Sequence, residues 1–133
     1  MSAIATAAAS AANLRCEYHV NPLGIDEPAP RLSWIMCDGR RGARQTAYQI
    51  LIASTPEKLT PREADVWDSG RVRTRQATHV EYAGPRLASR RRYWWTVRIW
   101  DAAGEATAFA APAFWEMGLL RRQEWRGEWI GLP

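Results

Sequence analysis

The stretch RRRYWWTVRIWD (residues 90–101) places four arginines, a tyrosine and three tryptophans within twelve positions. Side chains of a β-strand alternate between its two faces. In such a strand one face is apolar throughout, and it consists of Tyr93, Trp95, Val97 and Ile99. Burial of each of these side chains contributes about 1.5–3 kcal/mol to stability. The alternation therefore predicts a β-strand with one face in a hydrophobic core.

The opposite face of the same strand carries Trp94, Arg98 and Trp100. Two tryptophans on an outward face form an apolar patch that a lone domain rarely exposes. An arginine between them can stack on an indole ring, and it can also donate to a sugar hydroxyl or a carbonyl oxygen. We therefore expect this face to contact either a neighbouring domain or a carbohydrate, and we favour the neighbouring domain.

Shorter segments on both sides of this stretch show the same alternation. They are LRCEY (14–18), RLSWIM (31–36), QTAYQILIAS (45–54), VWDSGRV (66–72), QATHVEYAG (76–84) and TAFAAPAFWEMG (107–118). The inward positions predict a single core, whose main members are Trp34, Tyr48, Ile50, Tyr93, Trp95 and Val97. Pro112 interrupts the last segment, which indicates an edge strand or a bulge.

Segments rich in glycine, proline and charged residues separate these strands at intervals of roughly ten residues. Because no segment shows the pattern of a crossover helix, an antiparallel arrangement is expected. Leu87 lies six residues before Tyr93, a spacing typical of a tyrosine corner, in which the tyrosine hydroxyl bonds to nearby backbone. The sequence thus predicts an all-β fold, an antiparallel β-sandwich of the immunoglobulin or fibronectin-type-III kind with about seven strands.

The composition fits one soluble globular domain. A chain of 133 residues is long enough for one core and too short for two. The net charge is +4, and the 18 basic residues, among them the single lysine Lys58, are spread among 14 acidic ones. This modest charge without a basic block argues against nucleic-acid binding. Eight tryptophans are more than one small core buries fully, so some are expected to face another domain or a ligand.

The first 13 residues, MSAIATAAASAAN, are alanine-rich and lack the basic start of a secretory signal. They are also too short and too polar to span a membrane. We therefore expect a flexible leader over residues 1–13, no membrane partner and a cytoplasmic protein. Cys16 falls on an inward face and Cys37 on the face opposite to Trp34, so both are predicted to be free thiols.

Few acidic residues have a pattern suited to catalysis. Asp65 and Asp68 flank a tryptophan within one short segment. Hydrolysis of a glycosidic bond needs two carboxyl groups that face the sugar from two sides, so we interpret this pair as a solvated turn with a capping role. Glu105 lies at the predicted tip of a hairpin. We expect no catalytic residue in this chain alone.

The two histidines, His19 and His79, lie on separate segments, and neither has a recognisable second ligand or serine partner in the sequence. Asp26 and Glu27 lie in a proline-rich loop, where they are expected to cap backbone groups or to pair with Arg31. The basic turn GRRGAR lacks the lysine and the following helix of a phosphate-binding loop. The sequence predicts neither a metal site nor a cofactor.

Several segments, taken together and in order, resemble the N-terminal region of bacterial α-L-rhamnosidases that have an (α/α)6-barrel catalytic domain. The segments are NPLGIDEPAPRLSW, QTAYQILIAS, VWDSGRV, YWWTVRIWDAAGE, FWEMGLL and EWRGEWIG. One departure is that an aromatic-serine step common in the last strand reads Phe109-Ala110 here. The resemblance implies a fibronectin-type-III-like sandwich, over residues 14–118, that precedes further β domains and the barrel. It also implies an inverting mechanism with an acidic pair, whose motifs do not occur in this chain.

Residues 119–133 follow the last predicted strand and contain Trp125 and Trp129 in a strand-like run without a partner in the predicted sandwich. We interpret this stretch as a linker or the start of a further domain, and we expect its two tryptophans to contact a neighbouring domain or a carbohydrate. The chain is accordingly interpreted as a fragment, or a separately encoded piece, of a longer enzyme. Its expected partners are the downstream β domains and the catalytic barrel.

Three functions remain open at this point. The first is an accessory module that docks on neighbouring domains of an α-L-rhamnosidase and stabilises them. The second is a carbohydrate-binding module that uses Trp94 and Trp100 to stack on rhamnosylated glycans. The third is a stand-alone interaction domain that shares the fold, since a fold does not by itself determine a function.

Overall fold

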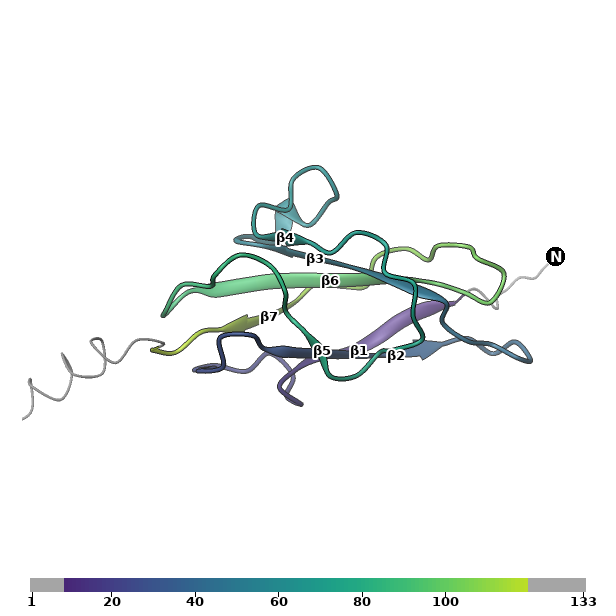
Figure 1. The fold of residues 1–133 in the computed structure, drawn as a ribbon, viewed down its shortest axis with the longest axis horizontal. Helices are drawn as coiled ribbons and strands as arrows, with labels where there is room; N and C mark the ends of the chain where they lie inside the picture. Colours follow the sequence, from purple (N-terminus) through teal and green to yellow (C-terminus); the bar gives the residue numbers. More distant parts are fainter. Residues whose placement is uncertain (1–8, 120–133) are drawn as a thin grey trace, which may run out of the picture.

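The structure is a computed structural model that describes residues 9–119, which form two antiparallel sheets packed face to face (Figure 1). The three-stranded sheet has the order β1-β2-β5, with β1 (Ser10–Cys16), β2 (Arg31–Cys37) and β5 (Val80–Glu81). The four-stranded sheet has the order β4-β3-β6-β7, with β4 (Trp67–Asp68), β3 (Ala47–Ala53), β6 (Arg92–Trp100) and β7 (Ala113–Glu116). A short 3-10 helix, η2 (Pro56–Lys58), lies between β3 and β4. The predicted antiparallel sandwich is confirmed.

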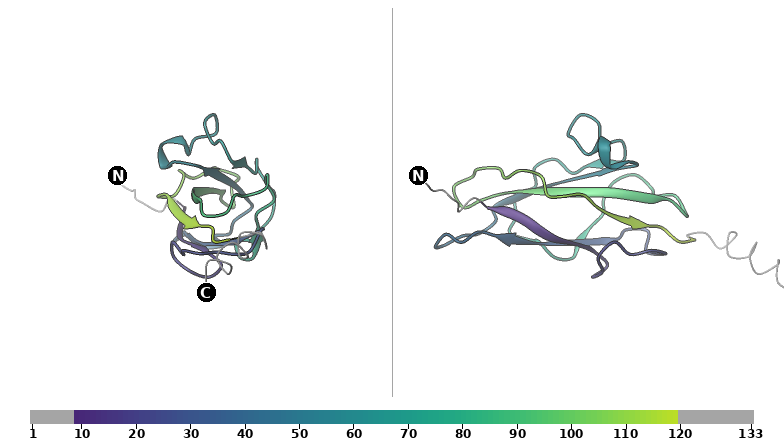
Figure 2. Two further views of the ribbon diagram at one scale, coloured as in Figure 1. Left: turned by 90° about the vertical axis from the view of Figure 1, so that its left-hand side faces the viewer. Right: turned by 180° about the vertical axis from the view of Figure 1, so that it is seen from behind.

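The pairing of β3 with β6 holds the four-stranded sheet together. It extends over seven positions, from Ala47 opposite Trp100 to Ala53 opposite Trp94. β6 is a central strand, since β3 pairs with one of its edges and β7 with the other. Figure 2 shows from two further directions that this sheet faces the three-stranded sheet across the interior. Alternate residues of β6 therefore point into the space between the sheets.

One cluster of buried side chains fills this space. Among its members are the six residues expected in the core, Trp34, Tyr48, Ile50, Tyr93, Trp95 and Val97. Trp95 and Trp115 are fully buried. The indole N–H of Trp34 donates to Oε1 of Gln45 at 2.9 Å, and that of Trp115 donates to the sulfur of Met117 at 3.0 Å. These bonds pair the N–H donors of two buried indole rings, and a buried donor without a partner would destabilise the fold.

A tyrosine corner joins the β5–β6 connection to β6. The hydroxyl of Tyr93, the second residue of β6, accepts a hydrogen bond from the backbone N–H of Ala88 at 2.7 Å. Leu87, next to Ala88 in the chain, is buried in the same core cluster as Tyr93. The tyrosine corner predicted from the spacing of Leu87 and Tyr93 is thus confirmed.

Strand β1 begins at Ser10 and so includes residues that the sequence assigned to a leader. Ser10 lies opposite Cys37, and Ala12 lies opposite Ile35, in antiparallel register. Alanines give no alternating signal, because their small side chains fit either face, whereas backbone pairing with β2 needs no particular side chain. At the other end, Tyr18 lies two residues after the inward-facing Cys16, so the alternation of LRCEY predicts it to face inward as well. It lies instead in the turn after β1 and is 55% exposed.

The last strand is short because the segment before it pairs irregularly with β6. The carbonyl oxygen of Ile99 accepts from the N–H of Thr107 at 2.8 Å, and that of Val97 accepts from the N–H of Ala110 at 3.0 Å. Between these bonds β6 advances by two residues and its partner by three, which is the count of a β-bulge. Regular pairing of β7 begins only after Pro112. The predicted interruption of this strand is confirmed.

Replacement of Trp95 by alanine should lower the free energy of unfolding by about 3–5 kcal/mol, because the indole is fully buried between the sheets. Urea denaturation followed by circular dichroism measures this change. As a control, Ile35→Ala removes a side chain that is 52% exposed on β2, and it should change the same free energy by less than about 0.5 kcal/mol. Equal effects of the two substitutions would show that the inward phase of β6 is wrong.

Candidate functional site

The outer face of the four-stranded sheet carries Trp94, Arg98 and Trp100, the contact residues singled out from the sequence. Trp100 is only 8% exposed. Two guanidinium groups lie over its ring, that of Arg71 at 4.7 Å from the ring centroid and that of Arg98 at 5.0 Å. Guanidinium groups at such distances are attracted by the electron-rich face of an indole. The ring of Trp100 is therefore covered by arginines of its own domain.

Arg98 is held in place by hydrogen bonds that cross the sheet. Its Nε donates to Oε1 of Gln49 at 3.0 Å, and Nε2 of Gln49 donates to Oδ1 of Asp68 at 2.9 Å. The guanidinium of Arg98 also lies 4.8 Å from the ring centroid of Phe109. The positive charge of Arg98 is thus linked through an amide to a carboxylate of the same domain.

Trp94 packs against a second, smaller group of buried apolar side chains on this outer face, formed by Leu51, Ala53 and Leu59. Leu59 belongs to the β3–β4 connection that contains η2. The ring of Phe114 lies beside Trp94, with the two ring centroids 5.0 Å apart. Trp94 is half-buried as a result. The β3–β4 connection therefore covers part of the face that β3 and β6 present.

Other residues of this chain cover much of the outer face of the four-stranded sheet. Alternation along β6 predicted which side chains share this face, but it left them without a partner inside the domain. The partners Arg71, Leu59 and Phe109 lie in connections that are distant from β6 in sequence or irregular in pattern, so periodicity could not identify them. Trp125 and Trp129, the other two proposed contact residues, lie outside the described residues.

In the sequence, Asp65 and Asp68 are closely spaced acids and thus candidates for a catalytic pair. The carboxylates of both accept hydrogen bonds from backbone N–H groups. The carboxylate of Asp65 accepts from the N–H of Ser54 at 2.8 Å and from its hydroxyl at 2.6 Å. Oδ1 of Asp68 accepts from the N–H of Gly70 at 2.8 Å. Asp68 thus caps a turn, as predicted, whereas Asp65 ties its connection to Ser54, which directly follows β3.

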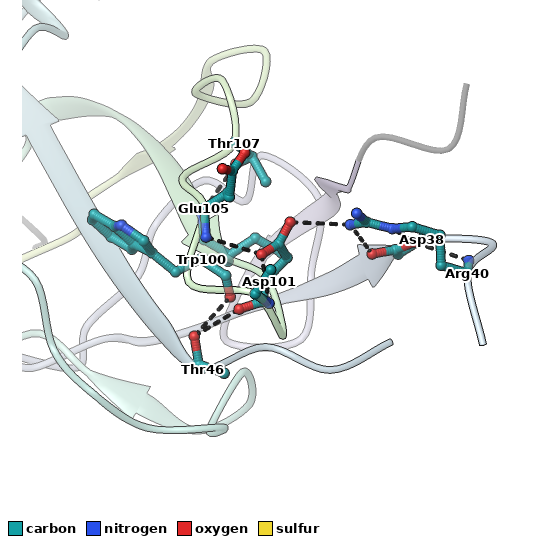
Figure 3. A network of polar contacts seen from close by, with 9 residues as sticks. Asp38, Arg40, Thr46, Trp100, Asp101, Glu105 and Thr107 are labelled. Carbon is teal, nitrogen blue, oxygen red and sulfur yellow. Dashed lines mark hydrogen bonds and ion pairs between the residues drawn. The ribbon is translucent and has the colours of Figure 1, made fainter. Parts of the chain in front are cut away.

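The hairpin that follows β6 is closed by Asp101, whose side chain is nearly buried. Its Oδ1 accepts from the N–H groups of Ala103 and Glu105, each at 2.9 Å, and its Oδ2 accepts from Nη2 of Arg40 at 3.1 Å (Figure 3). The hydrogen bond from Glu105 is the main reason why the pKa of Asp101 is lowered, and Arg40 adds to it. Arg40 also pairs with Asp38 and lowers the pKa of that carboxyl to about 2. The network ties the β2–β3 turn to the hairpin.

Arg31 pairs with Glu17 and not with Asp26 or Glu27, the acids that the sequence suggested. Oε1 of Glu17 lies 2.8 Å from Nη2 of Arg31, and Oε2 accepts from the N–H and Nε of Arg31 at 2.6 and 3.0 Å. Glu17 directly follows β1 and Arg31 begins β2, so the antiparallel pairing of these strands brings them together. Oε1 of Glu27 accepts from the N–H of Ala29 at 3.3 Å, which is the predicted capping role.

The histidines and cysteines do not gather into a group that could bind a metal ion within the described part of the chain. Nε2 of His79 lies 2.6 Å from the hydroxyl of Tyr18, while His19 bonds to Cys16 through backbone groups. Both cysteines are free thiols, and burial raises the pKa of Cys16 to about 12, whereas Cys37 is exposed. Among residues 9–119, no group of three histidine, cysteine or acidic side chains is placed to hold a metal ion. Over the same range, no helix has the length and apolar character needed to cross a membrane.

Comparison with known proteins connects this sandwich to a family. The sequence profile described as "Rha78A-like, N-terminal immunoglobulin domain" matches residues 11–121. The chain belongs to this family. This Rha78A-like domain is 47% identical over 117 residues to an α-L-rhamnosidase of Streptomyces avermitilis. The match spans 88% of this chain but only 11% of that enzyme.

Solved structures give the same result for the Rha78A-like domain. The crystal structure of the Streptomyces avermitilis α-L-rhamnosidase complexed with L-rhamnose matches with a TM-score of 0.84 at 44% identity, over 89% of this chain and 11% of that one. The α-L-rhamnosidase of Dictyoglumus thermophilum matches with a TM-score of 0.83 at 33% identity, over 88% of this chain and 13% of that one. The domain therefore corresponds to a small part of each of these two enzymes.

Replacement of Trp100 by alanine should destabilise the isolated chain by about 3 kcal/mol, because the ring is 8% exposed beneath Arg71 and Arg98. If Trp100 served only to contact a neighbouring domain or a sugar, its replacement would leave the free energy of unfolding of the isolated chain unchanged. Chemical denaturation of the 133-residue chain measures the difference. Arg71→Ala is the matched variant: it removes one guanidinium and should cost about 1 kcal/mol. Full native stability of Trp100→Ala would contradict the described cover.

Asp101 should make folding sensitive to acid. Because the pKa of Asp101 is lowered in the folded state, its ionised form stabilises the fold above the ordinary carboxyl pKa of about 3.9. That contribution is lost as the pH falls through and below this value. Asp101→Asn should therefore lower the free energy of unfolding at neutral pH. The free energies of unfolding of this variant at neutral and at acidic pH should also differ less than those of the native chain do. Urea unfolding at about pH 7 and about pH 3 measures both quantities.

The matched control for this substitution is Glu105→Gln on the same hairpin. Glu105 contacts Asp101 through its backbone N–H and C=O groups, which the substitution keeps. It should leave both the free energy and its pH dependence close to those of the native chain. An Asp101→Asn variant with the native loss of stability in acid would show that other carboxylates carry the effect.

Proposed function

We propose that this chain is the N-terminal immunoglobulin-like module of an α-L-rhamnosidase, and that it acts by packing on other domains of the same polypeptide. The observation that carries the proposal is the 47% identity over 117 residues to the Streptomyces avermitilis enzyme, of which the match covers 11%. The structural match to the same enzyme, with a TM-score of 0.84, supports it. In this proposal the full-length protein hydrolyses terminal α-L-rhamnose from glycosides.

The described residues support a role without chemistry of its own. Glycoside hydrolysis needs two carboxyl groups on either side of the scissile bond, separated by about 5–9.5 Å depending on the mechanism. The carboxylates of Asp65, Asp68 and Asp101 are instead engaged by backbone N–H groups or arginine. The catalytic pair is accordingly assigned to another part of the full-length enzyme. The downstream β domains and the barrel are the proposed partners.

The carbohydrate-binding alternative has less support from the structure. Aromatic platforms that stack on sugars need an open ring face, but Trp100 is covered by Arg71 and Arg98. Trp94 is half-buried against Phe114 and the group around Leu51. The outer face of the four-stranded sheet thus offers less open aromatic surface than the alternation along β6 suggested. Its tryptophans serve the stability of the sandwich itself.

A domain exchange tests the proposed function. The matched segment of the Streptomyces avermitilis α-L-rhamnosidase is replaced by this chain, and the chimera is compared with the parent enzyme and with a deletion of the segment. We expect the chimera to keep kcat/KM on an aryl α-L-rhamnoside within about twofold of the parent. Its melting temperature or soluble yield should exceed that of the deletion. Calorimetry and steady-state kinetics measure these quantities.

The purified 133-residue chain is the control for catalysis and should show no turnover of the same substrate. Turnover that persists through repurification and disappears in a point variant of this chain would overturn the non-catalytic role. A chimera that is no more stable than the deletion, although the isolated chain folds, would overturn the docking role.

A further inference from the structure

Large apolar side chains gather on the surface of one connection. Among the described residues, four large hydrophobic side chains are strongly exposed, and three of these are Tyr18 at 55%, Val20 at 60% and Leu23 at 65%. All three lie in the β1–β2 connection, residues 17–30. The fourth, Ile35, lies alone on β2. The ring of Tyr18 lies against His79 and Arg31, whereas Val20 and Leu23 belong to the part of the connection that runs beside β7. Exposed apolar side chains that lie close together mark interaction surfaces more often than isolated ones do.

This connection is held firmly against the edge of β7. Oδ1 of Asn21 accepts from the N–H of Phe114 at 2.9 Å, and the carbonyl oxygen of Pro22 accepts from the N–H of Glu116 at 3.0 Å. The N–H of Ile25 donates to the carbonyl oxygen of Glu116 at 2.9 Å. The connection thus runs along β7 like an extra strand, and Val20 and Leu23 are held in the open by a fixed backbone.

The turn that presents Tyr18 is strained. Glu17 and Tyr18 have φ angles of 48° and 69°, and Asn21 has a φ of 49°. Residues other than glycine adopt this left-handed region at a cost, and they keep it where surrounding contacts determine the conformation. Here the ion pair of Glu17 with Arg31 and the bond between Tyr18 and His79 supply those contacts. The strained backbone holds the ring of Tyr18 out of the core.

A groove beside Val20 extends this surface. It has a volume of about 350 Å³, and its walls are residues 11–14 of β1, Val20 with Asn21, and residues 110–113. Most side chains in its walls are small, and several are alanines. A concave surface with small walls next to protruding apolar side chains suits a protein surface with a projecting side chain.

The last described residues of the chain lie beside the β1–β2 connection. The N–H of Gly118 donates to the carbonyl oxygen of Ile25 at 2.7 Å, and a Cβ on Gly118 would lie 3.1 Å from the carbonyl oxygen of Gly24. Figures 1 and 2 show β7 ending beside the β1–β2 connection, at the end of the sandwich opposite to the start of β1. Leu119, the last described residue, therefore follows a glycine that lies against Gly24, the neighbour of Leu23 in the chain.

We propose that Val20 and Leu23 form the surface by which this sandwich contacts the domain that follows it in an α-L-rhamnosidase. The proposal rests on the proposed function and assigns its docking role to a particular surface. Covalent linkage at Leu119 makes the contact intramolecular, so the following domain meets this surface at a high effective concentration. The surface takes an apolar protein partner, because two large apolar side chains, Val20 and Leu23, project from a connection that borders a groove walled mainly by small side chains.

The test uses the chimera with the Streptomyces avermitilis enzyme and two aspartates placed in the surface, Val20→Asp with Leu23→Asp. In the chimera this double substitution buries charge in the proposed contact, and it should lower the melting temperature of the sandwich by about 5 °C or more. It should also raise hydrogen exchange in residues 17–30. In the 133-residue chain alone the same substitutions should shift the melting temperature by less than about 2 °C, because both side chains are more than half exposed.

Two matched variants separate the contact from a general effect of charge or of substitution. Ile35→Asp introduces one aspartate at a similarly exposed apolar side chain on β2, and it should leave the melting temperature of the chimera unchanged. Val20→Ile with Leu23→Met keeps the surface apolar, and it should keep the native melting temperature and exchange. Calorimetry and hydrogen exchange with mass spectrometry measure all variants in parallel.

Several outcomes would overturn the proposal. If the double aspartate variant of the chimera is as stable as the native chimera, and the native chimera exceeds the deletion, the docking role stands but this surface is wrong. If the melting temperature of the native chimera does not exceed that of the deletion, the proposed function is wrong, and the proposed surface is wrong as well. Dimerisation of the isolated chain that the double variant abolishes would assign the surface to a second copy. Binding of L-rhamnose that the double variant abolishes would assign it to sugar.

Discussion

The antiparallel pairing of β3 with β6 is the constraint on which the rest of the structure depends. Seven consecutive residue pairs, from Ala47 opposite Trp100 to Ala53 opposite Trp94, fix the face on which each side chain of both strands lies. A slip of one residue would exchange the two faces. It would move Trp95, which is fully buried, to the outer face of the sheet. The core, the tyrosine corner at the start of β6 and the arginine–indole contacts outside all require this one register.

A central strand with bulky side chains on both faces needs a cover on each side. The three-stranded sheet covers the inner face of β6, whereas connections of the same chain cover much of the outer face. Leu59 of the β3–β4 connection packs against Leu51 and Ala53, and Arg71 and Arg98 lie over Trp100. Each cation–π contact contributes only about 0.5–1 kcal/mol near the surface, but together they remove a large ring from solvent. The domain therefore has less need of a neighbour on this face.

The sequence predicted those features that depend on strand periodicity and on fixed spacing. Alternation identified the inward residues of β6, and the interval from Leu87 to Tyr93 identified the tyrosine corner. Contacts made between distant or irregular segments escaped it. Arg31 pairs with Glu17 across the β1–β2 register, although Glu27 is nearer in sequence. The exposed surface of the β1–β2 connection also escaped prediction, because its prolines and glycine gave no period from which the outward side chains could be read.

The two ends of the sandwich differ in chemistry, and this difference fits the proposed docking at the end where β7 stops. At the end where β1 begins, carboxylates of Asp38 and Asp101 meet Arg40 in a closed network. At the other end, Leu23 and its apolar neighbours project beside the point where the chain continues. Interfaces between domains of one chain bury about 600–1,500 Å² and are more polar than those of obligate complexes. In the proposed arrangement linkage supplies proximity, so a few apolar side chains near Leu119 would orient the sandwich, whereas a distant patch would need the chain to fold back.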